Sequence, residues 1–326
     1  MRHYITRQRR GKGFSYQLDG QTLRDNEQLD RIKSLAIPPA WTDVQIAVSP
    51  RAKVQATGRD QADRLQTIYN PSFRARQERA KFERMLDFAA SLPAARAKVD
   101  KDLSRRALDK RRVLAAVFRL LDTAYFRVGN PIYAKHHRSF GLTTLTRRHA
   151  EVKGDKIMFD FVGKSGQQQR KTLTDRRLAR LMRQLDELPG DQIFSYFDKS
   201  GEVRQLTSGD VNDYIRRVTG GDFTAKDFRT WGGTLLATAN LIKKPRPSDA
   251  KRRQKRVTAC LKSVAKRLGN TPAVVRSAYV HPELLERYLT SDDLSQAKLR
   301  VDSQPVERFC RSEESCLLEL FRPSSS

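Results

Sequence analysis

The spacing of apolar residues changes near residue 72. Before that point the chain alternates in short runs separated by turn residues, a pattern typical of strands. Phe14 to Leu18 and Gln21 to Leu23 flank Asp19-Gly20, which predicts a hairpin with a type I′ turn. Further elements are predicted as a helix over 26–35, strands over 44–48, 53–57 and 65–69, and a turn at 58–60. Residues 1–72 therefore predict a small β-rich domain, ending at Asn70-Pro71.

From Phe73 onward, apolar residues recur at intervals of three and four, as on the buried face of a helix. The run from Val113 to Ala124 predicts such a helix, with Arg127 at its C-terminal end. Further helices are predicted over 175–188, 208–218, 225–242 and 251–268, with a last helix starting at Pro282. Alternation over 143–152, 157–162 and 168–173 predicts a three-stranded sheet, with Lys164 at the tip of its second hairpin.

Residues that favour a helix start define the beginnings of two predicted helices. Thr224 with Asp227 three residues later predicts a capping-box variant, and Arg229 follows in the first turn. Thr271 can cap a short helix that begins at Pro272 and leads to Tyr279. Beyond about residue 300 the periodicity is lost. The fold class predicted is α+β: the small domain, a larger mainly helical domain over 73–295, and a loosely ordered tail over 296–326.

The charge of the chain indicates a polyanionic partner. Lys and Arg total 64 against 37 Asp and Glu, a net charge of +27, and 38% hydrophobic residues suit a folded protein. Because neutralising phosphates releases condensed counterions, nucleic acid is the leading candidate. The sequence predicts no membrane span and no secretory signal, since no apolar run has the required length. Three cysteines without a CxxC pair predict a reducing compartment and no zinc site.

Tyr279 is a candidate nucleophile, because a phenol can attack a phosphodiester and hold it covalently. Such a reaction needs donors on the non-bridging oxygens and a proton donor for the departing 5′ oxygen. Arginine suits the first task and lysine the second. Taken alone, Tyr279 is a weak signal, and a half-buried tyrosine packed on a helix is the more common explanation.

Several segments together resemble the type IB DNA topoisomerases, specifically the compact poxvirus and bacterial branch. They are FRVGNPIY (126–133), GLTTL (141–145), FVGKSG (161–166), KDFRTWGG (226–233) and LGNTPAVVRSAYVHP (268–282), together with VQATGRDQADRLQTIYNP (54–71) from the first domain. The resemblance covers roughly residues 10–290. It implies a fold of the tyrosine recombinase and type IB topoisomerase kind, and an enzyme that relaxes supercoiled duplex DNA.

The resemblance also assigns roles. Arg127 and Arg229 would clamp the scissile phosphate, Lys164 would protonate the 5′ oxygen, and Tyr279 would form a 3′-phosphotyrosine. Asn270 stands where the viral enzymes have histidine; its amide can donate to a phosphate oxygen but cannot titrate near neutral pH. DNA contacts are expected from Arg59, Tyr133, Lys135 and Lys226, although a packed ring explains Tyr133 equally well.

The implied enzyme is a monomer that clamps double-stranded DNA and needs neither ATP nor a metal ion. It would act in the bacterial cytoplasm, at the nucleoid. A tyrosine recombinase is the main alternative, but Lys226 stands where recombinases tend to carry histidine, and the β-rich first domain fits a topoisomerase better. A type IA topoisomerase would need an acidic metal cluster, which the sequence lacks. A non-catalytic basic DNA-binding protein is the remaining alternative.

Overall fold

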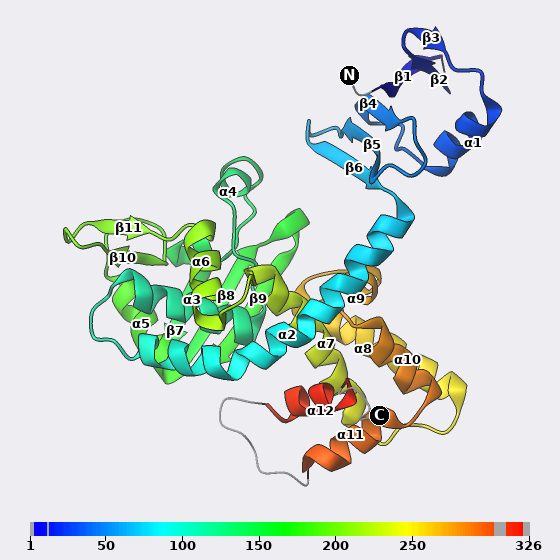
Figure 1. Ribbon diagram of the computed structural model, residues 1–326. Helices are drawn as coiled ribbons and strands as arrows, with labels where there is room; N and C mark the ends of the chain where they lie inside the picture. Colours follow the sequence, from blue (N-terminus) through cyan, green and yellow to red (C-terminus); the bar gives the residue numbers. More distant parts are fainter. Residues whose placement is uncertain (1–2, 12, 303–310, 322–326) are drawn as a thin grey trace. The chain divides into compact units, whose positions relative to one another are not determined.

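The computed structural model describes residues 3–11, 13–302 and 311–321 (Figure 1). The chain forms two compact units, Met1–Phe82 and Glu83–Ser326. The first is rich in strands and the second mostly helical, so the predicted α+β class is confirmed. Helix α2 (Pro71–Leu103) begins in the first unit and continues into the second from Glu83 onward, with Pro93 in its interior.

The first unit is a six-stranded antiparallel sheet with the order β3-β2-β1-β4-β5-β6. The strands are β1 (Tyr4–Arg10), β2 (Gly13–Leu18), β3 (Gln21–Thr22), β4 (Thr42–Ala47), β5 (Val54–Arg59) and β6 (Leu65–Tyr69), accompanied by α1 (Asn26–Ser34). The core joins Ile32 of α1 to Ile5, Val44, Ile46 and Ala56 of the sheet. Its hairpin turn is confirmed, since Asp19 and Gly20 both have positive φ.

Two details of this unit differ from prediction. Strand β1 was not predicted, because Ile5 is the only fully buried residue in a run that is otherwise polar and largely exposed. The turn predicted at 58–60 is wrong: β5 continues through Arg59, and the chain reverses after it. Asp60 Oδ1 accepts hydrogen bonds from the backbone N–H groups of Ala62 and Arg64, which fixes the turn there.

The second unit is built mainly from helices around a buried aromatic cluster. After α2 come α3 (Lys110–Ala124), α4 (Pro131–His137), α5 (Arg176–Asp186), α6 (Ser208–Thr219), α7 (Ala225–Ile242), α8 (Ala250–Leu268), α9 (Pro272–Ala278) and α10 (Pro282–Thr290). Phe228 of α7 packs edge-on against Phe88 of α2 and Phe118 of α3, with ring centroids 4.9 Å apart in both pairs. This packing fixes the first turn of α7, which carries Arg229.

A three-stranded antiparallel sheet, β7 (Ala150–Lys153), β8 (Lys156–Val162) and β9 (Gln168–Thr174), confirms the predicted sheet. Its first strand is shorter than the predicted 143–152, because 3-10 turns at Leu142–Thr144 and Arg147–His149 precede it. In the second turn, His149 Nδ1 accepts the Thr146 backbone N–H. A small hairpin of β10 (Ser195–Phe197) and β11 (Val203–Gln205) was not predicted.

The C-terminal region also differs from the prediction of a loosely ordered tail over 296–326. Helix α10 is followed by α11 (Asp293–Asp302) and α12 (Ser312–Leu320). Cys316, Leu317 and Leu320 of α12 are buried, because this face packs against α11 and α7 (Figure 1). The parts of the predicted tail at 303–310 and 322–326 lie outside the described residues.

None of the helices in the described part of the chain combines the length and apolar character needed to span a bilayer.

Candidate active site

Arg127 reaches the site from the end of α3. The helix stops because Tyr125 adopts the left-handed conformation, with φ of 54°, and its N–H donates to Leu121 O. The chain then turns away, and the Arg127 carbonyl accepts the Leu142 N–H at 2.9 Å. Gly129 (φ +114°) lies so close to Gly141 that a Cβ on Gly141 would meet Gly129 N at 2.5 Å. The half-buried Arg127 side chain is thereby held over the end of a packed helix.

Asn270 follows α8 and joins two guanidinium groups. Gly269 ends the helix with φ of +63°, a conformation that favours glycine, and a Cβ there would have to displace the Gln169 amide, which lies 2.2 Å from its position. Asn270 Oδ1 accepts hydrogen bonds from Arg127 Nη2 and from Arg229 Nη2, the latter at 2.9 Å. Because Oδ1 accepts from both arginines, the Nδ2 group is the side of the amide that can donate, and hydrogen bonding from Asn270 is among the causes that lower the pKa of the Tyr279 phenol.

Arg229 is deeply buried, with 4% of its surface exposed. Its Nη1 donates to Tyr125 O at 2.6 Å and its Nη2 to Leu268 O at 2.8 Å. Its Nε is buried without a hydrogen-bond partner, and no carboxylate pairs with it in the described part of the chain. Burial and the charge of Arg127 lower the pKa of Arg229 to about 10, even though Tyr279 opposes this. An anion placed here would satisfy both the spare donor and the excess charge.

Tyr279 forms the C-cap of α9, where its N–H donates to Val275 O at 3.0 Å. The Arg229 guanidinium carbon lies 5.1 Å from the centre of the Tyr279 ring. Burial alone would raise the pKa of the Tyr279 phenol, but the neighbouring Arg229 and Arg127 charges and hydrogen bonding outweigh it and lower this pKa. A lowered pKa makes the phenolate, which is the nucleophilic form, easier to reach.

The backbone of Tyr279 rests directly on α7. A Cβ on Gly233 would lie 2.4 Å from Tyr279 O, so this glycine allows the two segments to approach. The next residue, the fully buried Thr234, donates from Oγ1 to Tyr279 O at 3.2 Å and accepts the His281 N–H at 3.0 Å. The helix that carries Arg229 therefore also fixes the main chain on both sides of Val280.

Lys171 of β9 lies beneath this cluster and was not predicted as a site residue. Its Nζ donates to Ala124 O at 2.8 Å and to Arg267 O at 3.2 Å, so it joins the C-terminal ends of α3 and α8. Burial, reinforced by the charges of Arg229, Arg267 and Arg127, lowers the pKa of Lys171 to about 7. The signal in the sequence was the alternation of β9, which turns Gln169 and Lys171 inward together.

The structure thus brings together Arg127, Arg229, Asn270 and Tyr279 from four separate segments. Lys164 lies apart from this cluster: it starts a 3-10 turn between β8 and β9, it is exposed, and its side chain makes no hydrogen bond or ion pair with a described residue. It is free to contact a ligand that approaches from solvent.

The predicted DNA-contacting residues are exposed or half-buried. Tyr133 on α4 is 43% exposed with its ring 5.5 Å from that of His137, and Lys135 is exposed on the same helix. Lys226 is exposed in the first turn of α7. Arg59 belongs to the first unit, where it donates to Asp63 O and lies 3.3 Å from the Asp63 carboxylate. These side chains remain accessible to a large anionic partner.

The arrangement has the chemistry of an oxyanion site with an attached nucleophile. Two guanidinium groups and an amide converge beside a phenol of lowered pKa, and oxygens of a phosphodiester match such donors. Among the described residues, no three His, Cys, Asp or Glu side chains gather closely enough to hold a metal ion.

Comparison with known proteins gives the following matches. A sequence profile for the catalytic core of eukaryotic DNA topoisomerase I matches residues 70–304, and one for the N-terminal domain of bacterial DNA topoisomerase IB matches residues 13–60. The chain is 32% identical over 292 residues to DNA topoisomerase 1B of Acanthamoeba polyphaga mimivirus, covering 87% of each chain. It is 26% identical over 273 residues to DNA topoisomerase 1B of Vaccinia virus, covering 80% of this chain and 82% of that protein.

A longer relative is matched only in part. The chain is 24% identical over 272 residues to DNA topoisomerase 1 of Mycosarcoma maydis, which covers 74% of this chain but 26% of that protein. The core profile includes Arg127, Arg229, Asn270 and Tyr279, and ends at residue 304, before α12 begins.

Proposed function

This chain belongs to the type IB DNA topoisomerases, and on that premise we propose that Tyr279 cleaves one strand of duplex DNA and holds its 3′ end. The protein is an enzyme, a DNA topoisomerase I, which is an isomerase. The reaction we assign to its site is reversible transesterification. Because the phosphotyrosine conserves the energy of the phosphodiester, the strand can be resealed without ATP, and no step requires a metal ion.

In the forward step, the Tyr279 hydroxyl gives its proton to a solvent water molecule, and its oxygen attacks and bonds to the scissile phosphorus. The bond from phosphorus to the 5′ oxygen breaks, and this oxygen takes a proton from Lys164, giving a free 5′ hydroxyl. Arg127, Arg229 and the Asn270 amide donate to the non-bridging oxygens, where negative charge increases in the transition state. Religation reverses each transfer after the free end has rotated.

The observation that carries this proposal is the junction at Asn270. One amide oxygen accepts from both arginines, and Arg229 also lies against the nucleophile ring. Arg229 keeps a buried Nε donor without a partner among the described residues, which favours an external anion as the missing acceptor. Lys164, on an exposed turn, would approach the 5′ oxygen once DNA is bound.

We further propose that a monomer engages the duplex, with the first unit and the second each contacting DNA. Arg59 would contribute from the first unit, and Tyr133, Lys135 and Lys226 from the second, all on accessible side chains. A net charge of +27 supports such an extended phosphate interface. The bacterial nucleoid, in the cytoplasm, is the compartment that we propose, since it holds the substrate.

The test is relaxation of negatively supercoiled plasmid in chelator without nucleotide, comparing the natural protein with Tyr279→Phe. We expect complete relaxation by the first and none by the second, because phenylalanine has no nucleophilic oxygen. Denaturing the reaction with detergent should trap DNA covalently on the natural protein alone. Sequencing of the adduct should locate the DNA on Tyr279, with a free 5′ hydroxyl at the nick.

Two other outcomes would overturn the proposal. Binding without any covalent adduct would indicate a non-catalytic DNA-binding protein. Cleavage confined to paired sites, with exchange of strands between two duplexes and no relaxation, would indicate a tyrosine recombinase.

A further inference from the structure

Helix α12 lies beyond the region matched by the catalytic-core profile, which ends at residue 304, and yet it packs against α7, the helix that carries Arg229. Its inward face buries Glu314, Cys316, Leu317 and Leu320. A surface helix does not ordinarily bury a carboxylate, and Glu314 is only 3% exposed. The contacts of this one side chain indicate what the helix does.

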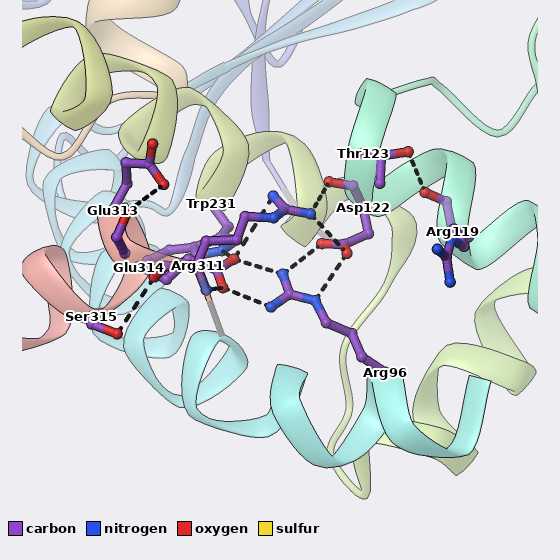
Figure 2. A network of polar contacts seen from close by, with 10 residues as sticks. Arg96, Arg119, Asp122, Thr123, Trp231, Arg311, Glu313, Glu314 and Ser315 are labelled. Carbon is purple, nitrogen blue, oxygen red and sulfur yellow. Dashed lines mark hydrogen bonds and ion pairs between the residues drawn. The ribbon is translucent and has the colours of Figure 1, made fainter. Parts of the chain in front are cut away.

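Glu314 connects α12 to α7 and α2 through a buried ion cluster, defined here as Arg96, Asp122, Arg311 and Glu314 (Figure 2). Arg96 donates to both carboxylates, with Nη1 and Nη2 each 2.6 Å from a Glu314 oxygen. Glu314 Oε1 also accepts the indole N–H of Trp231 at 3.2 Å. Trp231 follows Arg229 by two residues on α7, so this attachment holds the helix that supplies the buried arginine.

The other end of α12 is attached to the segment that follows the nucleophile. The ring of Phe321 lies 4.4 Å from that of His281, centre to centre. Arg287 of α10 donates to Leu320 O at 2.8 Å and lies over the Phe321 ring. His281 follows Tyr279 by two residues and caps α10, accepting the Glu283 N–H on Nδ1.

One attachment thus holds the helix of Arg229, and the other holds the segment that follows Tyr279. From the residues and contacts above, we propose that α12 is a positioning element for strand cleavage: through Glu314–Trp231 and Phe321–His281 it fixes the spacing between Arg229 and Tyr279. The inference rests on the proposed function, since it assumes that Tyr279 is the nucleophile. Glu314 and Phe321 act through other residues and do not touch the DNA. Because a displacement of about 1 Å between reacting groups can lower a rate by roughly 10²-fold, a loosened attachment should be measurable in the chemical step.

The experiment is single-turnover cleavage of a suicide DNA substrate at saturating enzyme, which separates the rate constant from the amplitude. Glu314→Gln removes the charge that pairs with Arg96, and Phe321→Leu removes the ring on His281. We expect each variant to lower the cleavage rate constant roughly 10-fold at full amplitude, with DNA affinity unchanged. A merely structural role would instead lower the amplitude, as folded enzyme is lost, and leave the rate constant alone.

Glu313→Gln is the matched control, because Glu313 makes its hydrogen bond with Ser312 Oγ and not with the ion cluster (Figure 2). It should cleave at the natural rate. Because both attachments belong to one element, the fold loss of rate in the double variant, relative to the natural protein, should be smaller than the product of the two single losses. If Glu314→Gln does not fold, Phe321→Leu decides alone.

Natural rate constants in the folded variants would overturn the inference while leaving the proposed function intact. Failure of the proposed function has a different signature, since the natural protein itself would then form no adduct. A slow Glu313→Gln variant would also overturn the inference, since the effect would not depend on the attachments of Glu314.

Discussion

The second unit contains two groups of buried or half-buried arginines, and they differ in what balances their charge. In the ion cluster, Arg96 and Arg311 meet the carboxylates of Asp122 and Glu314 within the chain (Figure 2). In the active site, Arg127 and Arg229 share a neutral amide oxygen, and no described carboxylate pairs with either. The charges of the first group are balanced within the cluster, and the second group has the charge and the donors for an anion that no described residue provides.

The pKa shifts of Arg96 and Arg229 differ in the same way as their partners do. Burial opposes the charged form in both groups, but Glu314 and Asp122 reverse this and raise the pKa of Arg96 above its ordinary value. At Arg229 the opposing effect of Tyr279 is too small to reverse the effect of burial, and burial together with the charge of Arg127 lowers the pKa of Arg229 to about 10. The charge of Arg96 is therefore favoured by its carboxylate partners, whereas the charge of Arg229 carries an electrostatic cost that a bound phosphate would relieve.

The largest expected effect is on stability, from breaking the paired group. Arg96→Met leaves Asp122 and Glu314 with Arg311 as their remaining partner in the cluster, and removing one partner of a buried ion pair typically costs about 3–5 kcal/mol. We expect the free energy of unfolding of the second unit to fall by about that amount, measured by denaturant titration. A loss below about 1 kcal/mol would mean that the cluster is nearly neutral in energy.

Arg229→Met is the counterpart in the unpaired group. It removes a buried charge that has no carboxylate, so the lost hydrogen bonds to Tyr125 O and Leu268 O are partly offset by relief of repulsion with Arg127. We expect a smaller loss of stability than in Arg96→Met but no detectable relaxation of plasmid. Equal destabilisation by the two substitutions would remove the distinction between the groups.

The sequence predicted the elements whose causes are local. Helix α7 begins at Ala225 as expected because Asp227 Oδ2 accepts the Thr224 N–H, and α9 begins at Pro272 because Thr271 Oγ1 accepts the Val274 N–H. Helix α12 was missed because its burial depends on distant residues. Glu314 reaches Trp231 across 83 positions and Arg96 across 218.

The candidate site also has features that the sequence predicted and features that depend on residues far apart in the chain. Each of its residue types was predicted from the motifs, but the sharing of Asn270 Oδ1 was not, since its partners lie 143 and 41 positions away. The sequence suggested a donor to phosphate at Asn270, and the structure adds that this side chain also joins the two arginines. Lys171 was not predicted as a site residue, because the sequence does not show whether a lysine in a strand lies on the buried or the exposed face of the sheet.

The next effect is on the cleavage rate, at Asn270, whose amide joins the two arginines of the active site. Asn270→Ala removes the acceptor shared by both arginines and a donor to the phosphate, so the cleavage rate constant should fall by roughly 10²-fold. Single-turnover adduct formation measures this. A near-normal rate would exclude Asn270 from the site.

Asn270→Asp sharpens the comparison. It puts a carboxylate between Arg127 and Arg229, which converts the unpaired group into a paired one without changing its shape. We expect cleavage to slow and DNA affinity to fall, while the protein unfolds at higher denaturant concentration than the natural chain. Slower cleavage with unchanged stability would mean that the two guanidinium charges are already well solvated.

The smallest effect concerns Lys171, the third cation beneath the site. Its pKa is about 7 in the folded chain, well below the ordinary value of 10.5 for lysine, because it is buried beside Arg229, Arg267 and Arg127. Between these two values the unfolded chain binds a proton that the folded chain does not, so stability must rise with pH across this window. Below pH 7 both states carry the proton, and the cost of burying the charge is present in full.

Lys171→Met should therefore flatten the pH dependence of unfolding. The natural protein is expected to gain up to about 1.4 kcal/mol per pH unit from this group between pH 7 and 9, and the variant to lack that gain. Methionine keeps most of the volume but cannot donate to Ala124 O and Arg267 O, so a pH-independent loss is expected as well. Lys156→Met, at an exposed position on the adjacent strand, is the control and should leave the slope unchanged. If the natural protein and Lys171→Met show the same dependence of unfolding free energy on pH, Lys171 stays charged in the folded chain. Hydration then screens its repulsion with the neighbouring arginines.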